Sequence, residues 1–187
     1  TVNIDNAEAA KVVIEHLQSL GHKMIGCVIG PIDESGSTPI TIERLAGYKA
    51  AMNAAHCEVK DEYLVNGDFS LQSGFEAAQH FADLEDRPTA VFCMNDEMAI
   101  GLIQGLKANG LRVPDDISVA GFDGIEFARY SDPSLTTVDQ PAEDIGRKAM
   151  TVLVDILEGR RPKDLRFTLP TELIARDSTG PVKKSRP

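Results

Sequence analysis

Residues 88–124 read PTAVFCMNDEMAIGLIQGLKANGLRVPDDISVAGFDG, and the fold class follows from their pattern. Thr89–Met94 is a short apolar run, typical of a strand that is buried on both faces. Apolar residues at helical spacing come next, and Gly110 predicts the end of that helix. Ile117–Phe122 is a second apolar run. A strand, a helix and a strand in about 35 residues form a βαβ unit, so we expect parallel strands with a right-handed crossover.

Polar residues follow both strands of this unit. Asn95 and Asp96 come directly after the first strand, and both are residue types that cap helices. Asp123 comes directly after the second strand. Because ligands bind at the carboxyl ends of parallel strands in open α/β sheets, we expect these side chains at a ligand-binding edge.

The same alternation continues on both sides of the unit. The strands that we expect are 2–4, 23–30, 62–67, 133–138 and one or two short ones within 165–174. The helices that we expect are 7–20 with Asn6 as its cap, 41–55 with Arg44 in its first turn, 72–84 with Phe75 inward, and 141–157, with one helical turn at 125–130. Residues 30–40 read as a polar loop and 178–187 as a polar tail. The prediction is an α/β domain with a parallel sheet flanked by helices.

Composition excludes several classes of function. The chain has 187 residues and a formal net charge of −10, which argues against gripping nucleic acid by itself. No apolar run approaches the roughly 20 residues of a membrane helix, so we expect no membrane partner. Cys27, Cys57 and Cys93 have no paired spacing, so we expect neither a disulfide nor a zinc framework, and a cytoplasmic location.

Motifs for catalysis are missing from the sequence. There is no phosphate-binding Gly-rich loop and no GxSxG, and the four histidines are scattered without metal-ligand spacing. We therefore expect no enzyme activity and no cofactor. One alternative stays open: Asp96 and Asp123 could hold Mg²⁺ between strand ends, as in a doubly wound hydrolase.

The loops offer groups for binding instead: Asp5, Arg44, Phe69, Asn95 and Asp123. A carboxylate accepts hydrogen bonds from neighbouring hydroxyls, a guanidinium donates in a fork, and an aromatic ring stacks. This set suits a small polyol or nucleoside. Arg44 could also be an ordinary surface residue, and Phe69 a loop aromatic that packs on the next helix.

Longer runs carry a resemblance to a known family. They are RLAGY (44–48), PTAVF (88–92), NDEMAIG (95–101), GLRVPDDISVAGFD (110–123), DPSLTTVDQP (132–141) and ELIARDST (172–179). In order and spacing they resemble the sensor domain of LacI/GalR-type transcriptional repressors, over nearly the whole chain. The resemblance implies two periplasmic-binding-protein-like lobes with an effector in the cleft between them.

The resemblance also implies roles for individual residues. Arg44 and Asp123 match the main polar effector contacts of the family, and Phe69 matches its stacking aromatic. Asn95 matches a polar cleft residue of some members, and Asp5 lies at the first crossover between lobes.

The resemblance divides the chain into segments. Residues 5–138 and 169–179 correspond to the C-terminal lobe, 139–168 to a segment returning to the other lobe, and 180–187 to a tail. The chain begins at Thr1, not Met, and the family's DNA-binding domain and the first half of the N-terminal lobe would precede it. We therefore expect a truncated fold in which the helix at 141–157 lacks its partner sheet and self-associates or is disordered.

The function that we predict is the effector-sensing domain of a bacterial repressor. Within the family the chain is most similar to members that sense cytidine, with purine-sensing members next, so the resemblance implies a nucleoside effector. It further implies a homodimer, operator DNA bound through the absent N-terminal domain, and cooperation with the cyclic-AMP receptor protein. The main alternative is a sugar- or solute-binding protein of a transport system, which shares the fold.

Overall fold

The computed structural model describes residues 1–33, 36–160 and 164–183. Its centre is a four-stranded parallel sheet in the order β5-β2-β6-β7. The strands are β2 (Ile25–Ile29), β5 (Leu64–Asn66), β6 (Ala90–Cys93) and β7 (Ser118–Ala120). The predicted βαβ unit and the predicted α/β class are both confirmed.

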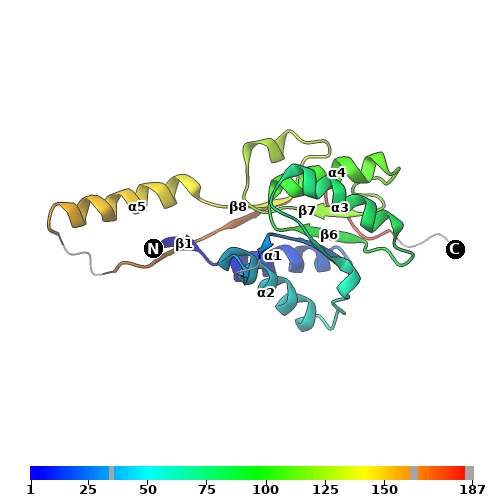
Figure 1. The fold of residues 1–187 in the computed structure, drawn as a ribbon, viewed down its shortest axis with the longest axis horizontal. Helices are drawn as coiled ribbons and strands as arrows, with labels where there is room; N and C mark the ends of the chain where they lie inside the picture. The colour runs from blue at the N-terminus through cyan, green and yellow to red at the C-terminus, as the bar shows by residue number, and fades with distance from the viewer. Residues whose placement is uncertain (34–35, 161–163, 184–187) are drawn as a thin grey trace.

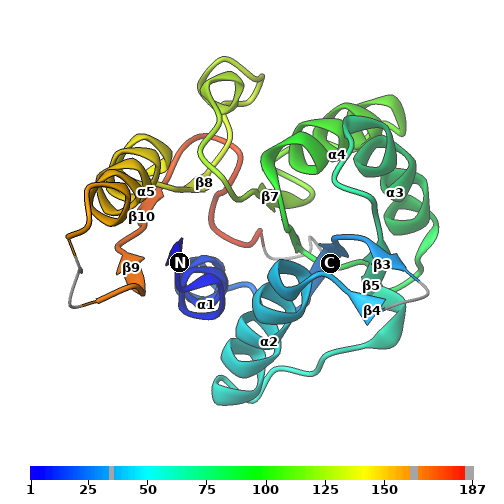
Figure 2. The ribbon, with the colours of Figure 1, turned by 60° about the vertical axis from the view of Figure 1, so that its left-hand side comes forward.

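Helices cover both faces of this sheet. On one side lie α1 (Asn6–Ser19) and α2 (Pro39–Ala54), and on the other α3 (Leu71–Asp83) and α4 (Asp96–Ala108) (Figures 1 and 2). Every residue of β2 and β6 is buried, as expected for strands covered on both faces. Cys27 and Cys93 lie in these two strands, and burial raises the pKa of both thiols. Both act as small apolar residues of the core.

Glycines let α3 and α4 approach each other closely. A Cβ atom placed on Gly101 would lie 1.9 Å from the carbonyl oxygen of Leu71. A Cβ atom on Gly74 would lie 2.0 Å from the carbonyl oxygen of Met98. Each helix thus presents a bare backbone to the other at these two positions, and no side chain fits there.

An arm extends from this body. In Figure 1, α5 (Ala142–Leu157) projects to the left, above β1 (Val2–Ile4) and β9 (Phe167–Leu169). The strands β1 and β9 pair in parallel outside the central sheet, and β8 (Thr137–Asp139) pairs antiparallel with β10 (Glu172–Ile174). The expected strand at 2–4 is therefore present, but it lies outside the central sheet, because its partner is β9.

The α5 helix keeps its apolar side in solvent. None of its described residues is buried, and Met150, Leu153 and Leu157 are exposed. The predicted helix is present and no other element covers its apolar side. The structure therefore contains an ordered helix where the sequence left disorder as one of two expectations. Its self-association stays a prediction.

Two smaller elements differ from what the sequence predicts, and a third agrees with it. The predicted polar loop at 30–40 contains a short hairpin of β3 (Ile32–Asp33) and β4 (Gly36–Ser37). A 3₁₀ turn, η1 (Asp61–Tyr63), delays the start of β5, because the Tyr63 ring is buried and its hydroxyl donates to the Asp86 carbonyl. The predicted turn after β7 is the 3₁₀ helix η2 (Glu126–Arg129).

The C-terminal segment is not a free tail over the residues that are described. Ser178 is fully buried, donating to the Val119 carbonyl at 2.6 Å and accepting from the Thr136 N–H at 2.8 Å. Lys183 Nζ lies 2.6 Å from a carboxylate oxygen of Asp115. The rest of the predicted tail, 184–187, lies outside the described residues.

The prediction that Phe75 points inward is wrong. Its side chain is 41% exposed. Because Gly74 takes the position closest to α4, the buried face of α3 runs through Ala77, Ala78 and Phe81 and leaves Phe75 at the rim.

Across the described residues, no helix is both long and apolar enough to span a lipid bilayer.

Candidate ligand-binding site

An open cleft of about 610 Å³ lies where the carboxyl ends of the sheet strands meet the arm. Its polar and aromatic lining comes from Asn3, Asn6, Glu43, Arg44, Phe69, Asn95, Asp123 and Gln140. These residues follow different strands of the chain, as the rule for parallel sheets predicts. Four of the five candidate residues therefore share one cleft.

Arg44 forms the floor of the cleft. Thr38 caps α2 and Pro39 starts it, so Arg44 lies in the second turn of the helix and not in the predicted first turn. Its side chain is 4% exposed. Nε donates to Asn6 Oδ1 at 3.0 Å, Nη1 donates to the Met94 carbonyl, and the guanidinium lies 3.6 Å from the centre of the Phe122 ring. A cation held on so many sides is a fixed part of the site.

Asp123 completes an ion pair with Arg44. The distance from Arg44 Nη2 to Asp123 Oδ1 is 3.2 Å, and Gln140 Nε2 donates to the same oxygen at 2.5 Å. Burial raises the pKa of Asp123, and this outweighs the attraction of Arg44, which acts to lower it. Burial also lowers the pKa of Arg44. Arg44, which is nearly fully buried, therefore depends on the Asp123 carboxylate to balance its charge.

Two cleft residues have backbones that are unusual for their side chains. Asp123 has a φ of 118° and Phe69 a φ of 69°, both in the left-handed region. Such conformations cost of order 1–3 kcal/mol each and are concentrated at ligand sites. Phe69 also depends on Gly30, because a Cβ atom there would lie 2.3 Å from the Phe69 ring. The chain thus stores strain in order to aim a carboxylate and a ring at the cleft.

Asn95 links the Phe69 loop to α4. Its Oδ1 accepts from the Met98 N–H at 2.9 Å, which caps the helix, and its Nδ2 donates to the Phe69 carbonyl at 2.8 Å. Asn95 was predicted as a cleft residue and as a helix cap, and it lines the cleft while serving as the cap. The side-chain amide of Asn95 therefore helps to hold Phe69 in place.

Asp5 and Asn6 exchange the roles predicted for them. Asp5 caps α1 by accepting from the Glu8 N–H at 2.9 Å and does not line the cleft. Asn6, expected as the cap, is 8% exposed, accepts from Arg44, and donates to Glu43 Oε2 at 2.9 Å. The helix begins one residue earlier than the sequence indicated, and this moves the cleft-facing position from Asp5 to Asn6.

Asp96 is fully buried behind the cleft and is not the helix cap. Its carboxylate accepts from the Thr137 hydroxyl at 2.5 Å and from the Ile125 N–H at 2.9 Å. These bonds join the loop after Asp123 to β8, and burial raises the pKa of Asp96 to about 6. The Mg²⁺ alternative gains nothing from this arrangement, since within the described chain no group of three or more His, Cys, Asp or Glu could hold a metal ion.

Sequence reasoning did not place Asn3, Asn6, Glu43 or Gln140 in the cleft. Gln140 follows the predicted strand at 133–138 and precedes a proline. The rule that pointed to Asn95 and Asp123, that polar residues after a strand lie at the ligand-binding edge, therefore also indicates Gln140. Glu43 adjoins Arg44 in the sequence, but neighbouring helical residues point in different directions, so its place in the cleft was not evident. Together the lining offers donors, acceptors and a ring, which is chemistry for holding a ligand.

Comparison with known proteins places these features in a family. A family described as a periplasmic binding protein-like domain matches residues 14–179. The HTH-type transcriptional repressor CytR of Escherichia coli (strain K12) is 41% identical over 179 residues, which are 96% of this chain and 51% of that protein. The HTH-type transcriptional repressor PurR of Vibrio campbellii is 38% identical over 182 residues, 97% of this chain and 52% of that protein.

Solved structures agree with this placement. A putative LacI transcriptional regulator from Bacillus cereus subsp. cytotoxis superposes with a TM-score of 0.89 at 32% identity, covering 96% of this chain and 62% of that one. The transcriptional regulator CelR, solved as a cellobiose complex, gives a TM-score of 0.87 at 34% identity, covering 95% and 53%. This chain spans about half the length of the curated relatives that it matches. The relatives are named as repressors and regulators, which confirms the prediction of a non-enzyme.

Proposed function

This chain belongs to the periplasmic binding protein-like family, as an effector domain of the LacI type, and on that premise we propose that its cleft senses a nucleoside. The observation that carries the proposal is the Arg44–Asp123–Gln140 cluster with Phe69 beside it in one cleft. The carboxylate of Asp123 accepts from the hydroxyls of a ribose, and the Phe69 ring stacks on a base. Binding through these groups needs no chemical step.

The proposed output of the cleft is control of DNA binding. A ligand that binds one relative orientation of two lobes better than another shifts the population toward that orientation. In a full-length repressor this shift would change the operator affinity of an N-terminal DNA-binding domain. A cytoplasmic homodimer, and cooperation with the cyclic-AMP receptor protein on DNA, belong to the same proposal.

A sugar is the second candidate effector. CelR was solved as a cellobiose complex, and the polar groups of this cleft suit sugar hydroxyls as well. Phe69 favours the nucleoside, because a planar base covers more of an aromatic ring than the edge of a polyol does. The alternative of a transport solute-binding protein has no support from these relatives, which are named as transcriptional regulators.

Calorimetric titration of the full-length protein with cytidine, adenosine, hypoxanthine and ribose tests the proposal. We expect a nucleoside to bind and Phe69→Ala to weaken it about tenfold, since base–aromatic stacking is worth about 1–3 kcal/mol. Phe75→Ala is the matched control, because that ring lies exposed on α3 and does not line the cleft. Binding of ribose alone, or equal loss in both variants, would count against a nucleoside effector.

A further inference from the structure

We propose that the cleft selects uncharged effectors against their phosphorylated forms, and that Glu43 is the residue that sets this selection. The inference rests on the proposed effector-binding function and concerns the class of ligand admitted. It follows from the charges of the cleft and from how each charge is held.

The charged lining of the cleft is negative on balance. Among the described residues that line it, the charged side chains are Glu43, Arg44 and Asp123. Arg44 and Asp123 neutralise each other across 3.2 Å. The carboxylate of Glu43 is therefore the charge that an entering ligand meets without a counter-ion among these residues.

Arg44 is poorly placed to bind an anion. It is nearly fully buried, rests on the Phe122 ring, and donates to Asn6 and to the Met94 carbonyl. A phosphate that approached it would also approach Asp123, which accepts from both Arg44 and Gln140. The cation thus serves to hold the carboxylate, and no other Lys, Arg or His is found among the described lining residues.

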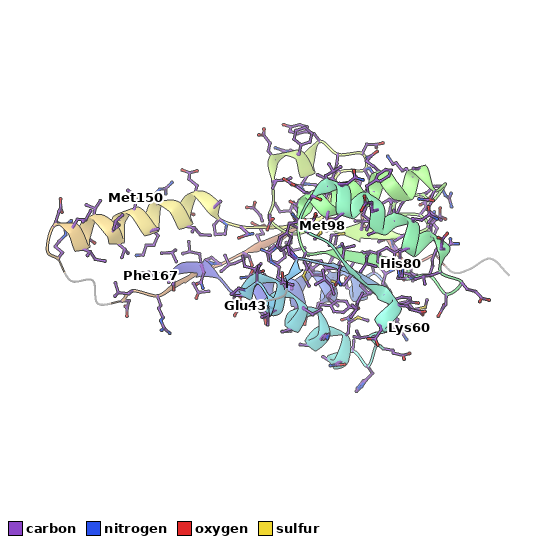
Figure 3. All side chains as sticks on the ribbon, viewed as in Figure 1. Glu43, Lys60, His80, Met98, Met150 and Phe167 are labelled. Carbon is purple, nitrogen blue, oxygen red and sulfur yellow. The ribbon has the colours of Figure 1, made fainter. Side chains whose placement is uncertain are left out.

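Glu43 is held at the cleft by a chain of hydrogen bonds. Arg44 Nε donates to Asn6 Oδ1, and this orients the Asn6 amide so that its Nδ2 donates to Glu43 Oε2 at 2.9 Å. Asn6 is itself 8% exposed, so its amide has little freedom to turn away. Figure 3 labels Glu43 at the end of α2 that faces the arm, and β1 of the arm contributes Val2 and Ile4 to the lining of the cleft.

The consequence for ligands is electrostatic. A phosphate monoester carries about −1.5 to −2 charges at neutral pH, and like charges a few ångströms apart repel appreciably even near solvent. A neutral ligand avoids this repulsion and can donate its hydroxyls to the Glu43 carboxylate. We expect a neutral ligand to bind at least about tenfold more tightly than the same ligand carrying a phosphate.

The test is a titration of matched ligand pairs against three forms of the full-length protein. The pairs are cytidine with cytidine 5′-monophosphate and ribose with ribose 5-phosphate. The proteins are the parent, Glu43→Gln and the control Glu85→Gln. Glutamine keeps an oxygen for the Asn6 amide to donate to, and Glu85 is an exposed residue away from the cleft lining.

We expect Glu43→Gln to lower the preference for the neutral ligand, measured as the ratio of the two affinities, about tenfold. Added salt should reduce the preference of the parent and of Glu85→Gln, but have little effect in Glu43→Gln. A parent protein that binds the phosphorylated ligand as tightly as the neutral one would overturn the inference and leave the proposed function standing. An unchanged preference in Glu43→Gln would also overturn it. If the parent bound none of the four ligands, both the inference and the proposed function would be overturned.

Discussion

Replacing Gly101 by alanine should destabilise the fold although alanine is the better helix former. The added Cβ atom would lie 1.9 Å from the Leu71 carbonyl oxygen, where ordinary contact begins at about 3.4 Å. Because that oxygen belongs to the backbone of α3, the two helices must separate by roughly 1.5 Å for the methyl group to fit. Overpacking of this kind costs about 1–3 kcal/mol, and the rigid obstacle places Gly101 at the upper end. Helix propensity returns about 1 kcal/mol, so we expect a net loss of about 2 kcal/mol.

Urea unfolding followed by circular dichroism measures this loss. Gly146→Ala in α5 is the matched control, because a Cβ atom there meets nothing within 4 Å, and it should leave the stability unchanged or slightly higher. If Gly101→Ala were as stable as the parent protein, the close approach of α3 and α4 would not exist as described, and the argument from backbone contact would be refuted.

Further predictions concern buried polar groups. Ser178→Ala leaves the Thr136 N–H buried without its acceptor, and should lower the free energy of unfolding by about 1–3 kcal/mol in the same urea assay; no loss would mean that the C-terminal segment is not docked. The pKa of Asp96 is about 6 in the fold against an ordinary 3.8, so its stabilising contribution is complete below the lower value and is lost as pH rises through 6. The free energy of unfolding of the parent should therefore fall relative to that of Asp96→Asn by about 2 kcal/mol between pH 4 and 7; parallel curves for the two proteins would contradict this.

The strands and helices of the body were predictable because local signals agreed with burial. Continuous apolar runs such as 89–94 and 117–122 are typical of strands in a sheet that helices cover on both faces, and each run contains a strand of the central sheet. Local signals could not predict contacts between residues that lie far apart in the sequence. Ser178 reads as polar and therefore as tail, yet it is buried because Val119 and Thr136, far away in sequence, satisfy its hydroxyl.

The cleft was predictable where its residues follow strands. Arg44, Phe69, Asn95 and Asp123 come together as expected, since parallel strands end at one edge. Asp5 was misplaced by a single residue, because helix boundaries are the least certain feature of a sequence and one position turns a side chain by about 100° around the helix axis.

The central claim is that a ligand binds at the Arg44–Asp123 pair. Titration of the full-length protein with cytidine, in the parent form and as Asp123→Asn, tests it most directly, with Asp61→Asn as a control from η1 and circular dichroism to verify folding. We predict that Asp123→Asn binds at least about tenfold more weakly, because a charged acceptor becomes a neutral amide, while Asp61→Asn binds as the parent does. Equal affinity in all three proteins would place the ligand elsewhere and contradict the account.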